Sequence, residues 1–182
     1  MRVIAGSAKS RKLVVPKGVA IRPTSDMVRE ALFASLAGRC IDCRFGDLYA
    51  GSGSVGLEAL SRAAARCVFI EQDQRCLQAL RANLEATGLA DRAEIVRGDV
   101  LAQIAGVWRR GPLDIVFLDP PYSERAEPAL RRVLGLARES DHACLVVVEC
   151  KRGLEPGLTP TQEKRYGSTK LLYYESADAA DV

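Results

Sequence analysis

The run Asp47-Leu48-Tyr49-Ala50-Gly51-Ser52-Gly53-Ser54-Val55-Gly56 decides the fold of this 182-residue chain. Residues 45–49 are predicted to form a strand and residues 55–65 a helix, so the glycines occupy the turn between them. Gly51, Gly53 and Gly56 match the pattern G-x-G-x-x-G, in which glycines let the backbone approach a nucleotide cofactor. The pattern in this context predicts a nucleotide site in an α/β sheet.

Acidic residues after the next two strands fit the same site. Glu71 ends the strand that follows and can accept hydrogen bonds from both ribose hydroxyls, with Asp73 as the fallback for that role. Asp99 follows a third strand and can accept a hydrogen bond from an adenine amino group, and Val100 is its neighbour. The glycine loop and Glu71 do not by themselves separate a nicotinamide dinucleotide from S-adenosylmethionine.

Strands and helices alternate outward from this loop. Several strands are unbroken apolar runs, as expected for parallel strands covered on both faces, so the chain is predicted to form an open, doubly wound sheet. The remaining predicted strands are 66–70, 93–97, 113–118, 143–148, 162–166 and 171–175, and the helices are 27–36, 74–87, 100–108 and 128–138. Residues 3–5 and 13–15 flank a polar, basic turn and are predicted to form a small β-hairpin.

Asp119-Pro120-Pro121-Tyr122 ends the fourth predicted strand, at the edge where open α/β sheets bind their ligands. The prolines stiffen the backbone and remove two donors, while Asp119 adds a carboxylate acceptor. Acceptors for both N–H bonds of an exocyclic base amine favour a pyramidal nitrogen whose lone pair can attack a methyl group. Tyr122 supplies a flat face on which a flipped-out base can stack. This string favours amine methylation over hydride transfer.

Charge and composition narrow the class of protein. The net charge is +3, but residues 1–39 hold eight Lys/Arg against two Asp/Glu, which favours a polyanionic partner. No apolar run is long enough to span a bilayer and no secretory signal is visible, so a cytoplasmic protein is expected. The six cysteines and the single His142 show no metal-ligand spacing, so we expect no metal and interpret these side chains as structural.

With these residues in view, the chain resembles the RsmD family of 16S ribosomal RNA guanine-N2 methyltransferases. The resemblance covers segments from one end of the chain to the other, and the second of them is the most discriminating. They are Arg2–Gly6 with Arg11–Leu13, Arg22-Pro23-Thr24 with Val28–Phe33, Asp47–Arg62, Asp119–Tyr122 and Lys164–Thr169. Ser10 stands where the family often has glycine, and Ser54-Val55 replaces a common Ala-Leu.

The resemblance implies a Rossmann-like, seven-stranded methyltransferase sheet over residues 21–182, mostly parallel with an antiparallel last strand, after a β-hairpin over residues 1–20. It implies S-adenosylmethionine as cofactor and 16S RNA in the 30S subunit or a late assembly intermediate as substrate. We expect the protein to act as a monomer. The implied catalytic residues are Asp119, Pro120 and Tyr122. The implied cofactor residues are Thr24, Asp47, Ala50, Gly51, Gly53, Gly56, Glu71, Asp99 and Val100. The implied RNA-binding residues are Lys9, Arg11, Lys12, Arg22, Lys164, Tyr166 and Thr169.

Three alternatives stay open at this point. The same chemistry could act on adenine N6 of DNA, although the chain has no visible target-recognition domain. A nicotinamide-dependent dehydrogenase would need a hydride-transfer acid and a second substrate domain, and neither is visible. A ribosome-assembly factor that binds S-adenosylmethionine without catalysis is not excluded by the sequence.

Overall fold

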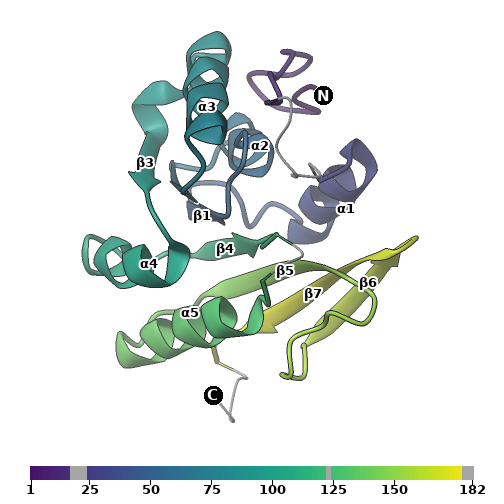
Figure 1. Cartoon of the computed structure of the whole chain (residues 1–182), viewed down its shortest axis with the longest axis vertical. Helices are drawn as coiled ribbons and strands as arrows, with labels where there is room; N and C mark the ends of the chain where they lie inside the picture. Colours follow the sequence, from purple (N-terminus) through teal and green to yellow (C-terminus); the bar gives the residue numbers. More distant parts are fainter. Residues whose placement is uncertain (17–23, 122–123, 178–182) are drawn as a thin grey trace.

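The structure, a computed structural model, describes residues 1–16, 24–121 and 124–177. Its centre is a seven-stranded sheet with the order β3-β2-β1-β4-β5-β7-β6 (Figure 1). The strands are β1 (Arg44–Leu48), β2 (Arg66–Glu71), β3 (Ala93–Arg97), β4 (Ile115–Leu118), β5 (Leu145–Lys151), β6 (Gln162–Tyr166) and β7 (Thr169–Glu175). The first five strands are parallel, whereas β7 is antiparallel to both β5 and β6. The predicted seven-stranded sheet, mostly parallel with an antiparallel last strand, is confirmed.

Helices cover both faces of the sheet and bury its apolar side chains. One face packs against α1 (Asp26–Leu36), α2 (Ser54–Ser61) and α3 (Gln74–Thr87), and the other against α4 (Val100–Arg109) and α5 (Glu127–Glu139). A short 3-10 helix, η1 (Ala90–Arg92), precedes β3. Because side chains alternate along a strand, Phe117 and Val147 face the first layer while Leu118 and Val148 face the second.

Local signals in the sequence account for the ends of these helices. The Ser25 side chain accepts a hydrogen bond from the Val28 N–H and caps α1, and Gly88 ends α3 in a left-handed conformation. The second helix stops at Ser61, earlier than residue 65, because Ala63 adopts a left-handed φ of 74° and turns the chain toward β2. No helix in the described part of the chain is long and apolar enough to cross a membrane.

The N-terminal residues pair with each other less regularly than predicted. Residues 3–5 and 13–15 form no strands, and the chain around them is joined by an isolated antiparallel bridge between Arg2 and Lys12. The reason is that the N–H groups of Ile4 and Ala5 donate to the carboxylate of Glu58 on α2, at 2.7 and 3.0 Å, instead of to a partner strand. Ser10 has a φ of 68°, which explains the glycine common at this position.

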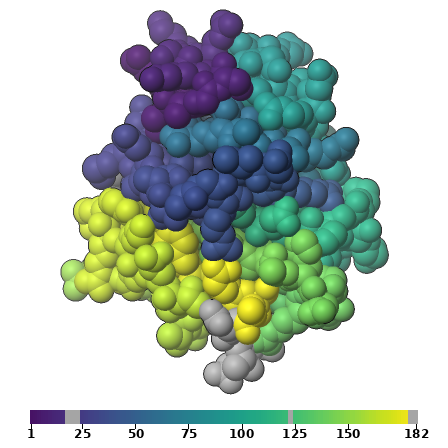
Figure 2. All heavy atoms as spheres, turned by 180° about the vertical axis from the view of Figure 1, so that it is seen from behind, coloured from purple at the N-terminus to yellow at the C-terminus, as the bar shows by residue number. Residues whose placement is uncertain are grey.

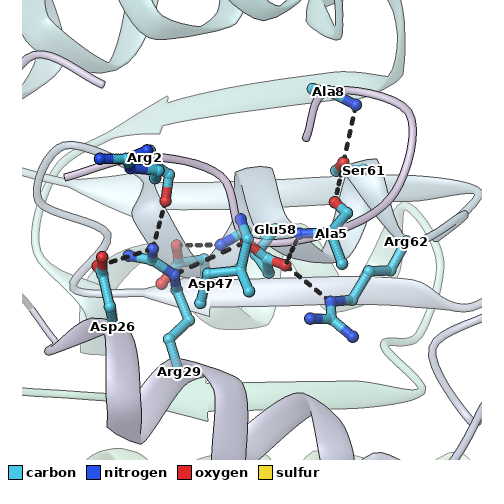
Figure 3. Close-up of polar contacts among 11 residues, drawn as sticks. Arg2, Ala5, Ala8, Asp26, Arg29, Asp47, Glu58, Ser61 and Arg62 are labelled. Carbon is cyan, nitrogen blue, oxygen red and sulfur yellow. Dashed lines mark hydrogen bonds and ion pairs between the residues drawn. The ribbon is translucent and has the colours of Figure 1, made fainter. Parts of the chain in front are cut away.

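Buried polar groups hold this N-terminal segment (residues 1–16) on the helices (Figure 3). Arg29 of α1 is fully buried, donates to the carbonyl of Arg2 and to Asp26, and lies 3.7 Å from Glu58 between Nε and Oε2. Glu58, also fully buried, forms a second ion pair with Arg62 at 2.7 Å. Figure 2 shows the N-terminal segment in purple at one end of the molecule, with β6 and β7 toward the other.

Candidate active site

A cavity of about 280 Å³ opens at the carboxyl edge of the parallel strands, beside the glycine loop. Its walls come from the turns after β1, β2, β3 and β4, and from the residues just before α1. The predicted site residues that line it are Thr24, Asp47, Ala50, Gly51, Glu71, Asp99, Val100, Asp119, Pro120 and Thr169. The fold therefore brings together acids and a loop that are far apart in the sequence.

The three glycines of the loop have different structural roles. Gly51 lines the cavity with a φ of 56°, and its N–H donates to Glu71 Oε2 at 2.7 Å. Gly53 and Gly56 are not among the residues that line the cavity; each instead lets α2 pack tightly. A Cβ at Gly53 would lie 2.3 Å from Leu80, and one at Gly56 would lie 2.3 Å from Phe69. These two glycines therefore determine the shape of the loop through packing on the side away from the cavity.

The acids after β2 and β3 are fixed by the backbone. Glu71 accepts three main-chain hydrogen bonds, from Gly51, Gln72 and Asp73, at 2.7–2.8 Å. A carboxylate has about four acceptor positions, so Glu71 is held rigidly with room for a further donor. Asp73 and Asp99 cap α3 and α4, and both also line the cavity. Their structural and ligand-facing roles are therefore compatible.

Three carboxylates gather at the inner end of the cavity: Asp47 of β1, Asp119 after β4 and Glu149 of β5. Burial raises the pKa of Asp47 to about 7, against a hydrogen bond of 2.8 Å from the Gly56 N–H that lowers it. Burial, and then the charges of Glu149 and Asp47, raise the pKa of Asp119 well above its ordinary value. Thr24 Oγ1 donates to Glu149 Oε2 at 2.8 Å.

The charge of the cavity is one-sided. Six carboxyl side chains line it and no Lys or Arg does so among the residues that the structure describes. Because like charges in a partly buried site repel each other, a positively charged ligand is favoured there over a negatively charged one. Such a site fits a sulfonium compound with an ammonium group far better than it fits a dinucleotide pyrophosphate, which needs free donors.

The predicted RNA-binding residues lie on two other surfaces. Lys9, Arg11 and Lys12 are exposed on the N-terminal segment. Lys164 lies over the ring of Tyr173, with its Nζ 5.9 Å from the centroid, and Tyr166 is partly buried against the core. Of the described RNA-binding candidates, only Thr169 lines the cavity. Arg22 and Tyr122 lie outside the described residues, as does Pro23.

Some lining residues were not predicted from the sequence. Glu149 lies in β5 after four apolar residues, and only the strand order, which puts β5 beside β4, brings it to Asp119. Val15 and Pro16 reach the cavity from the N-terminal segment. Asn83 of α3, which is fully buried, accepts from the Val14 N–H and donates to the Val14 and Ser52 carbonyls, and so ties that segment to the glycine loop.

The cysteines and His142 have structural surroundings. Cys40 and Cys43 are buried, and a hydrogen bond from the Cys43 thiol to Cys40, together with burial, raises the pKa of Cys43. His142 Nε2 lies 3.0 Å from Asp114, and its ring packs edge-on against Trp108. Within residues 1–16, 24–121 and 124–177, no group of three or more His, Cys, Asp or Glu side chains is arranged to hold a metal ion.

Comparison with known proteins gives one consistent result. A family described as "Conserved hypothetical protein 95" matches residues 1–175. The chain is 35% identical over 182 residues to the Bacillus subtilis "Putative rRNA methyltransferase YlbH", covering 96% of this chain and 98% of that one. It is 45% identical over 122 residues to the Escherichia coli "Ribosomal RNA small subunit methyltransferase D", covering 67% and 60%. The solved "Putative methyltransferase yhhF" from Escherichia coli superposes with a TM-score of 0.77 at 35% identity, covering 96% and 97%.

Proposed function

The chain belongs to the RsmD family of ribosomal RNA methyltransferases, and from that premise we propose that it methylates the N2 amine of one guanine in 16S RNA, with S-adenosylmethionine as the methyl donor. The observation that carries the proposal is the position of Asp119. This carboxylate follows β4 and lines a cavity whose other walls are the glycine loop and the acids after β2 and β3. The proposed catalytic carboxylate and the proposed cofactor residues therefore line the same cavity.

The residues present fit this cofactor. Glu71 is oriented by three backbone donors to accept from ribose hydroxyls, and Asp99, after the neighbouring strand β3, lines the same cavity and is available for the adenine amine. Asp47 and its neighbours give the inner end a negative charge that attracts a sulfonium and an ammonium group. When bound, the cofactor supplies an electrophilic methyl group. Methylation removes the sulfonium charge, so the same carboxylates favour the charged donor over the neutral product.

The residues of the chain contribute orientation and a proton acceptor. Asp119 accepts one N–H of the target amine, and the main-chain carbonyl of Asp119 or Pro120 is suited to the other, because proline adds no competing donor. The bound cofactor would supply its methyl group to the N2 lone pair, and Asp119 or solvent would accept the N2 proton that leaves. A carboxylate with a raised pKa is a better proton acceptor than an ordinary one. Tyr122 is proposed to stack on the base.

The substrate is proposed to be the 30S subunit or a late assembly intermediate, bound by a monomer in the cytoplasm. Lys9, Arg11 and Lys12 are exposed on the N-terminal segment and would contact RNA phosphates. Arg22, Lys164, Tyr166 and Thr169 complete the proposed RNA surface around the cavity. Residues 1–39 hold eight Lys/Arg and two Asp/Glu, and this positive charge offsets the repulsion between the acidic cavity and the RNA phosphates.

The test is transfer of labelled methyl groups from S-adenosylmethionine to small subunits from cells that lack this protein, followed by nucleoside analysis. We expect N2-methylguanine at one site with the wild type, and none with Asp119→Asn. The matched control is Asp91→Asn, an exposed aspartate of η1, which should keep full activity. Cofactor binding by both variants, measured by calorimetry, shows that they are folded. A methylated product other than N2-methylguanine, or full activity of Asp119→Asn, contradicts the proposal.

A further inference from the structure

Glu149 stands beside the proposed catalytic aspartate without an assigned role. Leu118 of β4 and Val148 of β5 are register partners, so Asp119 and Glu149 are the next residues on two neighbouring parallel strands. Side chains alternate along strands, and neighbouring strands are about 4.8 Å apart. The two carboxylates therefore emerge side by side on the face that α1 covers, and the charge of Glu149 contributes to the raised pKa of Asp119.

The position of Glu149 is set by a buried threonine. Thr24 Oγ1 donates to Glu149 Oε2 at 2.8 Å, and Thr24 is only 4% exposed. Glu149 lines the main cavity and also a small adjoining pocket, and Asp119, Pro120 and Thr169 are shared by both. The carboxylate therefore lies at the boundary between these two pockets. Because Glu149 emerges beside Asp119, a base whose amine reached Asp119 would bring its edge close to Glu149.

The edge that carries the target amine distinguishes guanine from other purines. Guanine presents N1–H and N2–H as adjacent donors, which match the two oxygens of a carboxylate, whereas the N1 of adenine or of a 2-aminopurine is an acceptor. A carboxylate opposite an N1 lone pair would leave two acceptors facing each other in a partly buried site.

On this basis, and resting on the proposed function, we propose that Glu149 determines base specificity: it accepts N1–H and one N2–H of the target guanine, while Asp119 accepts the other N2–H. Thr24 orients Glu149 and so acts as a positioning residue. A carboxylate accepts up to about four hydrogen bonds, so the bond from Thr24 is compatible with two bonds from the base. The site selects guanine by its donors and methylates it at the same amine.

The test compares guanosine with 2,6-diaminopurine at the target position of reconstituted small subunits. Both bases carry the N2 amine, but only guanosine has N1–H. We expect the wild type to prefer guanosine by at least about 100-fold in kcat/KM, because sites built for a substrate N–H reject analogues that lack it. Glu149→Gln should lower kcat/KM on guanosine and raise it on diaminopurine, since its amide can donate to N1, so that the ratio falls at least about tenfold. The matched control is Glu139→Gln at the exposed end of α5, which should leave the ratio unchanged.

The outcomes separate this inference from the proposed function. If the wild type methylates guanosine and Glu149→Gln keeps the wild-type ratio, the inference is wrong and the proposed function stands. If Glu149→Gln loses affinity for S-adenosylmethionine in calorimetry, Glu149 serves the cofactor and the inference is also wrong. If the wild type methylates no guanine, both fail together. A collapsed ratio with unchanged cofactor affinity supports the inference, because a merely structural role would slow both bases equally.

Discussion

Glu58→Gln tests whether the buried ion pair under the N-terminal segment stabilises the fold as its geometry indicates. Arg29 and Glu58 both have fully buried side chains, and Arg29 Nε and Nη1 form no hydrogen bond with the described residues. The other acidic partner of Arg29, Asp26, is 57% exposed. Burial lowers the pKa of Arg29, so its charge depends on a nearby carboxylate (Figure 3). Glutamine keeps the size of Glu58 and removes its charge, and its NH2 group also replaces one of the two oxygens that accept from the Ile4 and Ala5 N–H groups.

The expected loss is about 3–5 kcal/mol, which is typical when one partner of a buried pair is removed and the other charge stays buried. At roughly 2–4 °C per kcal/mol for a chain of this size, the midpoint of thermal unfolding falls by about 10 °C. Asp26→Asn is the control, because an exposed partner contributes at most about 1 kcal/mol. Urea unfolding at fixed pH measures both values.

A double-mutant cycle makes the reasoning refutable. Arg29→Met removes the buried cation, so Arg29→Met with Glu58→Gln should be less destabilised than the sum of the single variants, by about 2 kcal/mol or more. If Glu58→Gln costs less than about 1 kcal/mol and the two changes simply add, the pair does not support the charge of Arg29. The N-terminal segment would then be held mainly by its backbone hydrogen bonds and by packing.

Three further predictions concern the cavity and its surroundings. Asn83→Ala removes the three hydrogen bonds that Asn83 makes with Val14 and Ser52. We expect a loss of about 2–4 kcal/mol in urea unfolding and faster proteolysis near residue 14. An unchanged cleavage rate would show that Asn83 does not hold the N-terminal segment. Since the pKa of Asp47 is raised to about 7 from 3.8, the contribution of its protonated form to stability is present at low pH and lost as the pH rises through about 7. The unfolding free energy of Asp47→Asn should therefore change less between pH 5 and pH 8 than that of the wild type. An equal change in both proteins would contradict this. Changing the three exposed basic residues at positions 9, 11 and 12 to alanine should weaken binding to small subunits and flatten its salt dependence, and an identical salt slope would remove the segment from the RNA surface.

The sequence predicted those parts of the molecule whose cause is local. Helix α3 begins at Gln74 and ends at Thr87, as predicted, because its apolar spacing is regular and Gly88 terminates it. The glycine loop and the acids after β2 and β3 lie at the predicted strand ends, because each follows directly from the strand before it, while their binding roles stay predictions. Asp119 was predicted in the same way, from a short motif at a strand end. Local chemistry, read along the chain, was enough for all of these.

What the sequence did not predict depends on contacts between distant residues. Residues 3–5 have the composition of a strand, but the carboxylate of Glu58 takes the N–H groups that a strand partner would use. No periodicity along the chain can show that a residue 53 or 54 positions away will compete for those donors. The sequence did not predict Glu149 as a site residue for a similar reason. Its position beside Asp119 follows from the strand order and from the register of β4 and β5.

Gly53 matches the G-x-G-x-x-G pattern, but the structure gives a different reason for a glycine at this position. The pattern G-x-G-x-x-G suggested that its glycines give a ligand access to the backbone, but a Cβ at Gly53 would lie 2.3 Å from Leu80 and 3.3 Å from Phe69, away from the cavity. Its φ of 81° adds strain for any other residue. A valine there would therefore abolish cofactor binding only by displacing the loop, and the loss of stability should be as large as the loss of affinity. The conformation of the loop thus depends on its packing against β2 and α3 as much as on the ligand it is proposed to bind.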